Sequence, residues 1–254
     1  MSVRRRLRAR ADQWIGARFA RRVRRETTGR EPSAELTGLV TESFLALYEP
    51  DGELIEPPAV VRDAIVRQFH NLWFGAGVST WFNNTTYRGT PVLQHPFDLW
   101  IYQELIDRIR PALIIETGTW SGGSARYLGD LCALVGTGHV ITIDIEHQQP
   151  VPEHERVTYL LGPSTSPEIV KQIRERLPAN GPVMVMLDSD HSADHVLEEL
   201  HLYAPMVTVG SYLIVEDTAV NGHPVWPSYG PGPFEAVEKF FFTSNRGGFL
   251  KRLS

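Results

Sequence analysis

Apolar residues in the second half of the chain fall into short runs that alternate with segments of helical periodicity. The runs are five or six residues long, as buried strands are, and cover residues 112–116, 139–144, 157–161, 183–188 and 211–216. Helical periodicity marks residues 97–109, 124–134, 167–177 and 193–203. Buried strands that alternate with helices predict an α/β fold, in which a mostly parallel sheet is covered by helices on both faces.

The N-terminal part has a different pattern. Apolar periodicity over residues 35–48 and 60–73 predicts two helices. Residues 75–94 are aromatic and turn-rich without a period, which suggests an ordered loop near a site as much as a linker. The predicted organisation is therefore a helical extension with a substrate or oligomer loop over residues 1–95, followed by the α/β domain over residues 96–254.

Composition narrows the class of protein. With 254 residues, 42% of them hydrophobic, the chain can bury the core of one α/β domain. The single cysteine, Cys132, excludes an intrachain disulfide framework and a multi-cysteine zinc site. No apolar run approaches the length of a membrane span. We therefore expect a cytoplasmic protein without a membrane partner.

Charge is unevenly distributed along the chain. Of the 25 Lys and Arg residues, 11 lie in the first 30 positions, where only Asp12 and Glu26 are acidic. Such a segment can bind nucleic acid, but the spacing of Ile15, Phe19 and Val23 predicts a basic amphipathic helix instead. Because the rest of the chain is acidic, we expect no nucleic-acid partner.

Parallel sheets bind ligands beyond the carboxyl ends of their strands, so the residues after each run form the candidate site. The first run leads into Glu116-Thr117-Gly118, and Gly122-Gly123 precede Ser124 at the start of the next helix. Glycines permit a tight turn there and let a ligand approach the backbone. The turn lacks the lysine of a phosphate-binding loop and the glycine spacing of a dinucleotide-binding loop. It resembles the acidic-x-Gly motif of class I methyltransferases, with an ordinary strand-to-helix turn as the alternative.

Carboxylates end three of the later runs. Asp144 ends the second, where an acid can accept both hydrogen bonds of a ribose diol. Asp188 ends the fourth run, and Glu216 and Asp217 end the fifth. Neighbouring strands would bring these three acids to one rim, where they repel one another unless a cation joins them, and oxygen ligands favour Mg²⁺ or Mn²⁺. Asp190 is the rival ligand, and a solvated acidic rim without a metal is the alternative.

These motifs resemble catechol O-methyltransferase and, more closely, the cephalosporin hydroxylase family, which includes rhamnosyl O-methyltransferases. The closer resemblance lies in Tyr102-Gln103-Glu104, in residues 116–124, 188–191 and 215–224, and in Gly230-Pro231-Gly232-Pro233 with Glu235-Ala236-Val237. It runs from Arg88 to the C-terminus and implies a Rossmann-like class I methyltransferase fold. Few residues remain after the last helix, so we expect the usual final pair of strands to be reduced to one, at residues 239–243.

The resemblance implies an O-methyltransferase that depends on S-adenosylmethionine and on Mg²⁺ or Mn²⁺. The implied cofactor-binding residues are Glu116, Thr117, Gly118, Ser124, Asp144, Ser164 and Asp188. The implied metal ligands are Asp188, Glu216 and Asp217. His191 occupies the position of the catechol enzyme's catalytic lysine, three residues after the first metal-binding Asp, and is predicted to be the base, with His223 as a second candidate.

The predicted acceptor is a hydroxyl group of a sugar or of a glycosylated natural product in secondary metabolism. Aromatic and polar residues suited to such a ligand fall in loops near the proposed site, namely Tyr87, Arg88, His95, Trp120, Trp226 and Tyr229. We also expect a homo-oligomer. One alternative is β-lactam hydroxylation or methoxylation, although the sequence lacks the His-x-Asp/Glu and distant His of an iron oxygenase. The other is a non-catalytic partner protein, which would tend to lack the three acids together.

Overall fold

The computed structural model describes residues 59–74, 85–146 and 150–244. The chain divides into two compact units, residues 1–68 and 69–254. Helix α3 (Ala59–Phe74) spans this division and confirms the helix predicted over residues 60–73. The helix predicted over residues 35–48 and the basic N-terminal helix lie outside the described residues.

Five parallel strands form the central sheet of the second unit, in the order β5-β4-β3-β6-β7. Their bounds are β3 (Leu113–Thr117), β4 (Val140–Asp144), β5 (Val157–Leu161), β6 (Val183–Leu187) and β7 (Leu213–Val215). Each strand lies within one residue of a predicted run or inside it. The register pairs Thr117 with Ile143 on one side and with Leu187 on the other, so the carboxyl ends of the three inner strands lie at one edge.

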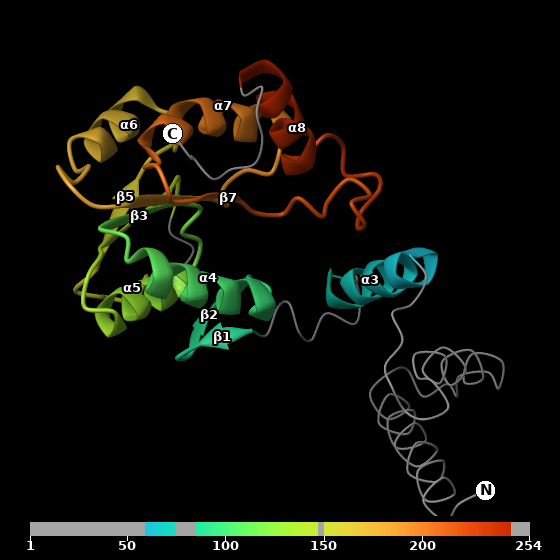
Figure 1. Cartoon of the computed structure of the whole chain (residues 1–254), viewed down its shortest axis with the longest axis horizontal. Coiled ribbons are helices and arrows are strands. Elements are labelled where there is room, and N and C mark those ends of the chain that lie inside the picture. The colour runs from blue at the N-terminus through green and yellow to red at the C-terminus, as the bar shows by residue number, and fades with distance from the viewer. Residues whose placement is uncertain (1–58, 75–84, 147–149, 245–254) are drawn as a thin grey trace, which may run out of the picture. The chain divides into compact units, whose positions relative to one another are not determined.

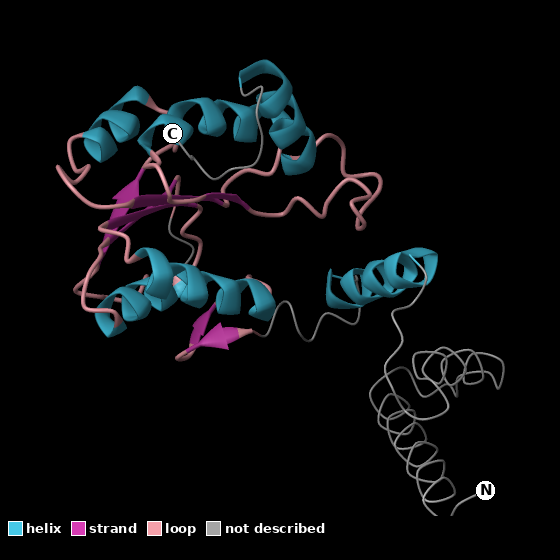
Figure 2. Cartoon of the chain, in the orientation of Figure 1, coloured by secondary structure: helices cyan, strands magenta, loops and turns pink. Residues whose placement is uncertain are grey.

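Helices cover both faces of this sheet (Figures 1 and 2). One face carries α4 (Pro96–Ile109) and α5 (Gly123–Leu134), and the other carries α6 (Pro167–Arg174), α7 (Ala193–Tyr203) and α8 (Pro233–Ser244). Successive strand residues point to opposite faces, so Ile114 packs into the core beneath α4 and α5 while Ile115 packs into the core beneath the other layer. The α/β fold predicted from the sequence is confirmed. Within the described residues, no helix has the length and hydropathy needed to cross a bilayer.

A small antiparallel hairpin, which the sequence pattern did not predict, precedes α4. It pairs β1 (Thr86–Tyr87) with β2 (Thr90–Pro91). Arg88 and Gly89 both have positive φ, 50° and 81°, the backbone that a two-residue type I′ turn requires. The strands are only two residues long, too short for an alternating pattern to stand out, and an Arg-Gly turn is a weaker signal than Asn-Gly.

The strand expected over residues 239–243 is wrong. Those residues continue α8, which packs on the same core as α7. Phe240 follows Val237 by three positions and Ala236 by four, which is the helical spacing, and all three contact that core. The run of three phenylalanines resembled a strand because aromatic residues are enriched in strands, but the burial of one helical face decides the outcome.

Candidate active site

A cavity of about 520 Å³ opens at the carboxyl ends of β3, β4 and β6. Its lining contains seven of the residues predicted from the sequence, namely Gly118, Ser124, Asp144, Ser164, Asp188, His191 and Asp217. Residues 91–94, which follow the hairpin, line another part of the wall. Five of the seven predicted cofactor residues and two of the three predicted metal ligands therefore line one cavity, with Asp188 counted in both groups.

The turn after β3 has no room for a side chain at Gly118. Gly118 has a φ of 91°, and a Cβ on it would lie 1.8 Å from the backbone oxygen of Asp188. The turn therefore lies directly against the end of β6, which only a glycine permits. Thr119 and Trp120 continue the turn, and Gly122 takes a left-handed φ of 76° at the start of α5.

Glu116 and Thr117 are buried in β3, next to the cavity rather than in its lining. One carboxyl oxygen of Glu116 accepts a 2.6 Å hydrogen bond from Thr142, while the other, Oε1, has no partner among the described residues. Burial raises the pKa of Glu116 to about 7, and the charges of Asp188 and Asp144 act in the same direction against the hydrogen bonds that lower it.

The second and third strands supply Asp144 and Ser164. One Asp144 oxygen accepts a 2.7 Å hydrogen bond from the backbone nitrogen of Trp120, which joins the end of β4 to the glycine turn. Ser164 is buried, and its hydroxyl lies 3.3 Å from Nε2 of His195. His195 also lies 3.4 Å from the fully buried Glu199, so a histidine not predicted to take part borders this end of the cavity.

Another part of the cavity wall holds a compact cluster of two acids and a histidine. Nε2 of His191 lies 3.5 Å from Asp188 and 3.2 Å from Asp217. One potential ligand atom from each of these three residues lies within 4.8 Å of the others, a spacing that suits a metal ion. Asp217 reaches this position through a left-handed backbone with a φ of 52°, which Asp tolerates better than most residues do.

Burial raises the pKa values of the acids in and beside this cluster. Burial raises the pKa of Asp188 to about 6, and the charge of Asp217 adds to the effect while His191 opposes it. Burial also raises the pKa of Asp217, and burial together with Asp188 raises the pKa of Glu216. For His191, burial lowers the pKa, but the nearby carboxylates of Asp188 and Asp217 outweigh it, so the pKa is raised overall.

Glu216 lies beside the cluster without joining it. Its carboxylate accepts a hydrogen bond from the hydroxyl of Tyr102 on α4. Asp188 accepts a 2.5 Å hydrogen bond from the side chain of Gln94. Neither donor was singled out as a site residue, because each reaches the rim from a segment far away in the sequence. The assignment of Asp188, Glu216 and Asp217 as metal ligands stays a prediction.

Two other candidates lie apart from the three-residue cluster. His223 lies 3.0 Å from Glu235, and its ring stacks on Phe234 with centroids 3.9 Å apart. Asp190, the rival ligand, is exposed, and its carboxylate accepts a hydrogen bond from the backbone of Ser192. Both assignments therefore rest on the sequence alone.

The loop residues suggested for the acceptor have different surroundings. Trp120 lines the cavity, and Trp226 stacks on Tyr229 with centroids 6.3 Å apart. Arg88 instead forms an ion pair with Asp130 at 2.8 Å, and His95 accepts a hydrogen bond from the first turn of α4. Tyr87 packs edge-on against Tyr127 of α5, so these last three residues hold the fold together.

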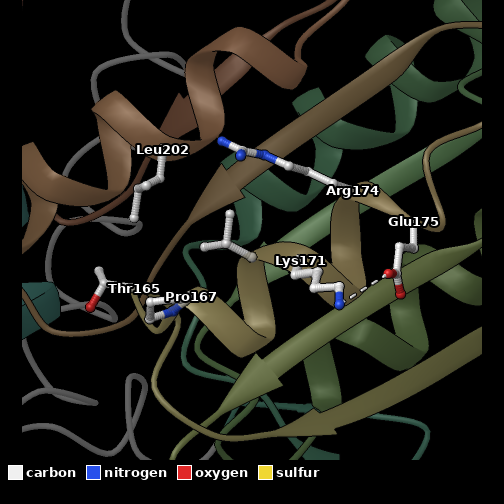
Figure 3. Close-up of a pocket in the computed structure, with 7 residues that line it drawn as sticks. Thr165, Pro167, Lys171, Arg174, Glu175 and Leu202 are labelled. Carbon is white, nitrogen blue, oxygen red and sulfur yellow. Dashed lines mark ion pairs between the residues drawn. The ribbon is translucent and has the colours of Figure 1, made fainter.

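A second hollow, of about 460 Å³, involves α6 and α7 (Figure 3). Its wall includes Val170 and Leu202 together with charged residues of α6. Lys171 pairs there with Glu175 at 3.8 Å, and both side chains are exposed. None of the predicted site residues lines this hollow, so the chemistry is sought in the cavity at the strand ends.

A parallel sheet, a glycine turn after its first strand and carboxylates at the ends of the next strands define a class. They are the features of Rossmann-like, S-adenosylmethionine-dependent methyltransferases, as the sequence predicted. The chain belongs to the Rhamnosyl O-methyltransferase/CmcI family, whose sequence model matches residues 79–252. It is accordingly an O-methyltransferase, and the family predicted from the motifs is confirmed.

Known proteins agree with this assignment. The rhamnosyl O-methyltransferase of Mycobacterium tuberculosis is 38% identical over 213 residues, which covers 75% of this chain and 86% of the relative. The rhamnosyl O-methyltransferase of Mycobacterium leprae is 36% identical over 212 residues, with 75% and 91% covered. Among solved structures, a CmcI-N160 apo-structure matches with a TM-score of 0.51 and 24% identity over 72% of this chain and 81% of that one, which supports the fold.

Proposed function

We propose that this protein transfers the methyl group of S-adenosylmethionine to a hydroxyl group of a sugar or glycosylated natural product, with the help of Mg²⁺ or Mn²⁺. One observation carries the proposal: the glycine turn, Asp144 and the acidic cluster line the same cavity. A methyl donor and an acceptor hydroxyl must meet within such a cavity, because transfer requires the two reacting atoms to be held close together and aligned.

The residues around the glycine turn fit the cofactor. Gly118 exposes backbone where a side chain would fill the space, and Asp144 offers carboxylate oxygens at the position suited to a ribose diol. Glu116 has a buried oxygen without a partner among the described residues, which suits a cationic group near the turn. S-adenosylmethionine supplies the methyl group, and Gly118, Ser124, Asp144 and Ser164 would position it.

The acidic cluster fits a divalent cation. Burial raises the pKa values of Asp188, Glu216 and Asp217, so a shared positive charge would favour the ionised form of all three. Asp188 and Asp217 lie within ligand spacing of each other, and Glu216 ends the neighbouring strand region. A cation held there would polarise an acceptor hydroxyl and lower its pKa.

His191 is the residue best placed to accept the acceptor's proton. Its Nε2 is buried in the cluster and lies near Asp188 and Asp217 without a hydrogen-bonding geometry to either. The two acids raise its pKa, so binding of a cation would bring that pKa down again. A histidine that titrates near neutral pH suits general base catalysis.

The acceptor class is inferred from the relatives and from the loop after β7. Both mycobacterial relatives are named rhamnosyl O-methyltransferases, which points to a deoxysugar hydroxyl. The half-exposed rings of Trp226 and Tyr229 stack on each other. Burial raises the pKa of Tyr229, and the charges of Asp190 and Asp217 raise it further. Aromatic faces beside acidic groups suit a ring that has both apolar and hydroxyl-bearing sides.

β-Lactam hydroxylation remains the second candidate, because CmcI shares the family name. The cluster of one histidine and two acids has the ligand types of a non-haem iron site. Such oxygenases, however, use two histidines and one carboxylate, whereas this cluster has one histidine and two carboxylates. A purely structural partner protein would not need a raised-pKa acid cluster inside a cofactor-sized cavity. The methyltransferase is therefore favoured.

The test is calorimetric titration with S-adenosylmethionine, with and without Mg²⁺, followed by a methyl-transfer screen on rhamnosides, nucleotide sugars and a cephalosporin. We expect saturable cofactor binding and methylation of at least one glycoside. Cofactor binding with hydroxylation or methoxylation of the β-lactam, and no transfer to sugars, would favour the second candidate. Absence of cofactor binding would contradict both.

A further inference from the structure

Two side chains from outside the sheet hold the acids of the cluster region. Nε2 of Gln94, in the segment after β2, donates a 2.5 Å hydrogen bond to Oδ2 of Asp188. The hydroxyl of Tyr102, on α4, donates a hydrogen bond to Glu216. Gln94 and Tyr102 are 5% and 4% exposed, so both are fixed parts of the interior and not surface contacts.

We propose that Gln94 is a positioning residue for the divalent cation. Its amide occupies Oδ2 of Asp188, which leaves Oδ1, the oxygen 3.5 Å from His191, turned toward the cluster. A carboxylate that is free to rotate offers its oxygens to a cation in several orientations, whereas one held by a hydrogen bond offers a single orientation. This inference rests on the proposed function, since it concerns the same metal site.

The amide group suits this role chemically. Gln94 donates through an uncharged N–H, so it orients Asp188 without cancelling the negative charge that attracts the cation. A lysine or arginine at this position would orient the carboxylate equally well but would compete with the cation electrostatically. Tyr102 is a neutral donor as well, which gives Glu216 the same kind of support.

The position of Gln94 is fixed by the hairpin that precedes it. The hairpin lies against α5, where a Cβ on Gly123 would be only 2.0 Å from the backbone oxygen of Pro91. Arg126 of α5 donates hydrogen bonds to the side chain of Thr90 at 3.0 Å and to the backbone of Arg88 at 3.2 Å. Gln94 follows only three residues after Pro91, so α5 sets where its amide lies.

This arrangement connects the first turn of α5, near the proposed cofactor, with the proposed cation site at Asp188. The first turn of α5 contributes Gly123 and Ser124 to the cavity wall, near the proposed cofactor. The same turn holds the hairpin that places Gln94 on Asp188. Loosening the hairpin should therefore weaken cation binding indirectly, by a smaller factor than loss of the Gln94 amide itself.

The experiment is a calorimetric titration of the full-length protein with Mn²⁺, without any acceptor. Gln94→Ala and the similarly sized Gln94→Met should bind Mn²⁺ about 10- to 100-fold more weakly than the parent, the usual effect of losing a group that orients a metal ligand. Arg126→Met should give a smaller loss. Gln172→Ala, at a glutamine on α6 outside the cavity lining, is the control and should match the parent.

The affinity for S-adenosylmethionine, measured on the same variants, separates a specific effect from general damage. It should fall by a smaller factor than the affinity for Mn²⁺ in both Gln94 variants, and Gln94→Met should retain the thermal unfolding midpoint if Gln94→Ala does not. Parental Mn²⁺ affinity in Gln94→Met would overturn the inference while leaving the proposed function intact. Absence of Mn²⁺ binding to the parent would overturn the metal site and this inference together.

Discussion

The cavity wall has two adjoining parts, a backbone end around the glycine turn and a side-chain end around Asp188, which are built in different ways. The end around the glycine turn is made largely of backbone, with Gly118 packed against the end of β6 and Asp144 bonded to the turn. The end around Asp188 is made of side chains that converge from β6, the loop after β7, the segment after β2 and α4. One end is shaped by the sheet, and the other is assembled from distant parts of the chain.

The difference in construction is also a difference in charge. At the glycine turn, the hydrogen bonds of Asp144 come from backbone nitrogens of its own surroundings. In the cluster and beside it, Asp188, Asp217 and Glu216 have raised pKa values, and His191 lies close to the first two. The backbone end can be complete without a ligand, whereas the side-chain end needs a counter-charge. Four predictions test this contrast.

Removal of the divalent cation should have the largest effect, because it takes away the counter-charge of the whole cluster. Treatment with EDTA should abolish methyl transfer to a sugar acceptor, and Mg²⁺ or Mn²⁺ should restore it. Addition of Mg²⁺ to the chelated protein should also raise its unfolding midpoint, since a ligand that binds only the folded state stabilises it. Full turnover after exhaustive chelation would contradict the metal assignment and would make Asp188 or Asp190 the candidate base.

Replacement of His191 should have the next largest effect. His191→Ala should lower kcat by roughly 10²- to 10⁴-fold, the usual contribution of a general base, with little change in the affinity for S-adenosylmethionine. His223→Ala is the matched control, because His223 pairs with Glu235 apart from the cluster. Near-parental kcat in His191→Ala with a large loss in His223→Ala would place the base in the loop after β7.

The contrast between the two ends also separates what the sequence could predict from what it could not. Glu116, Asp144 and Asp188 each end a recognisable apolar run, so the rule for parallel sheets placed them at one edge. The same rule predicts that Asp188, His191 and Asp217, which lie at or just after strand ends, line one cavity. Gln94 and Tyr102 could not be found in this way, because their contacts span 94 and 114 positions of sequence and depend on how the hairpin and α4 dock.

The misjudged C-terminal segment has the same origin. Residues 239–243 have the composition of a strand, and only the core beneath α8 decides that Val237 and Phe240 are buried along one helical face. The roles assigned to Glu216 and His223 likewise depended on position in a motif. The structure directs those side chains toward Tyr102 and Glu235, which no local pattern records.

At the backbone end, replacement of Asp144 should produce a moderate loss. Asp144→Ala should weaken S-adenosylmethionine binding by about 1.5–3 kcal/mol, because a ribose diol loses a charged acceptor. Calorimetry measures the change, and Asp107→Ala, at an exposed aspartate on α4 outside the cavity lining, is the control. Metal affinity should stay unchanged in both variants. Equal cofactor affinity in Asp144→Ala and the parent would remove Asp144 from the binding site.

The smallest predicted effect concerns Glu116 and appears only as a dependence on pH. Burial raises its pKa from 4.5 in an exposed chain to about 7 in the fold, so the folded protein holds a proton that the unfolded chain has lost between these values. Stability contributed by this group is therefore present below pH 4.5 and is lost as the pH rises toward 7. Glu116→Gln keeps an uncharged group of similar shape, so its unfolding midpoint should match the parent near pH 5 and exceed it at pH 8.

The same Glu116→Gln variant should bind S-adenosylmethionine more weakly at pH 8, because the oxygen Oε1 of Glu116 no longer offers a negative charge to the cofactor. Thermal unfolding and calorimetry at the two pH values measure both effects. An equal shift of the midpoint at pH 5 and pH 8 would mean that Glu116 is ionised throughout, and that the backbone end of the cavity supplies a counter-charge of its own.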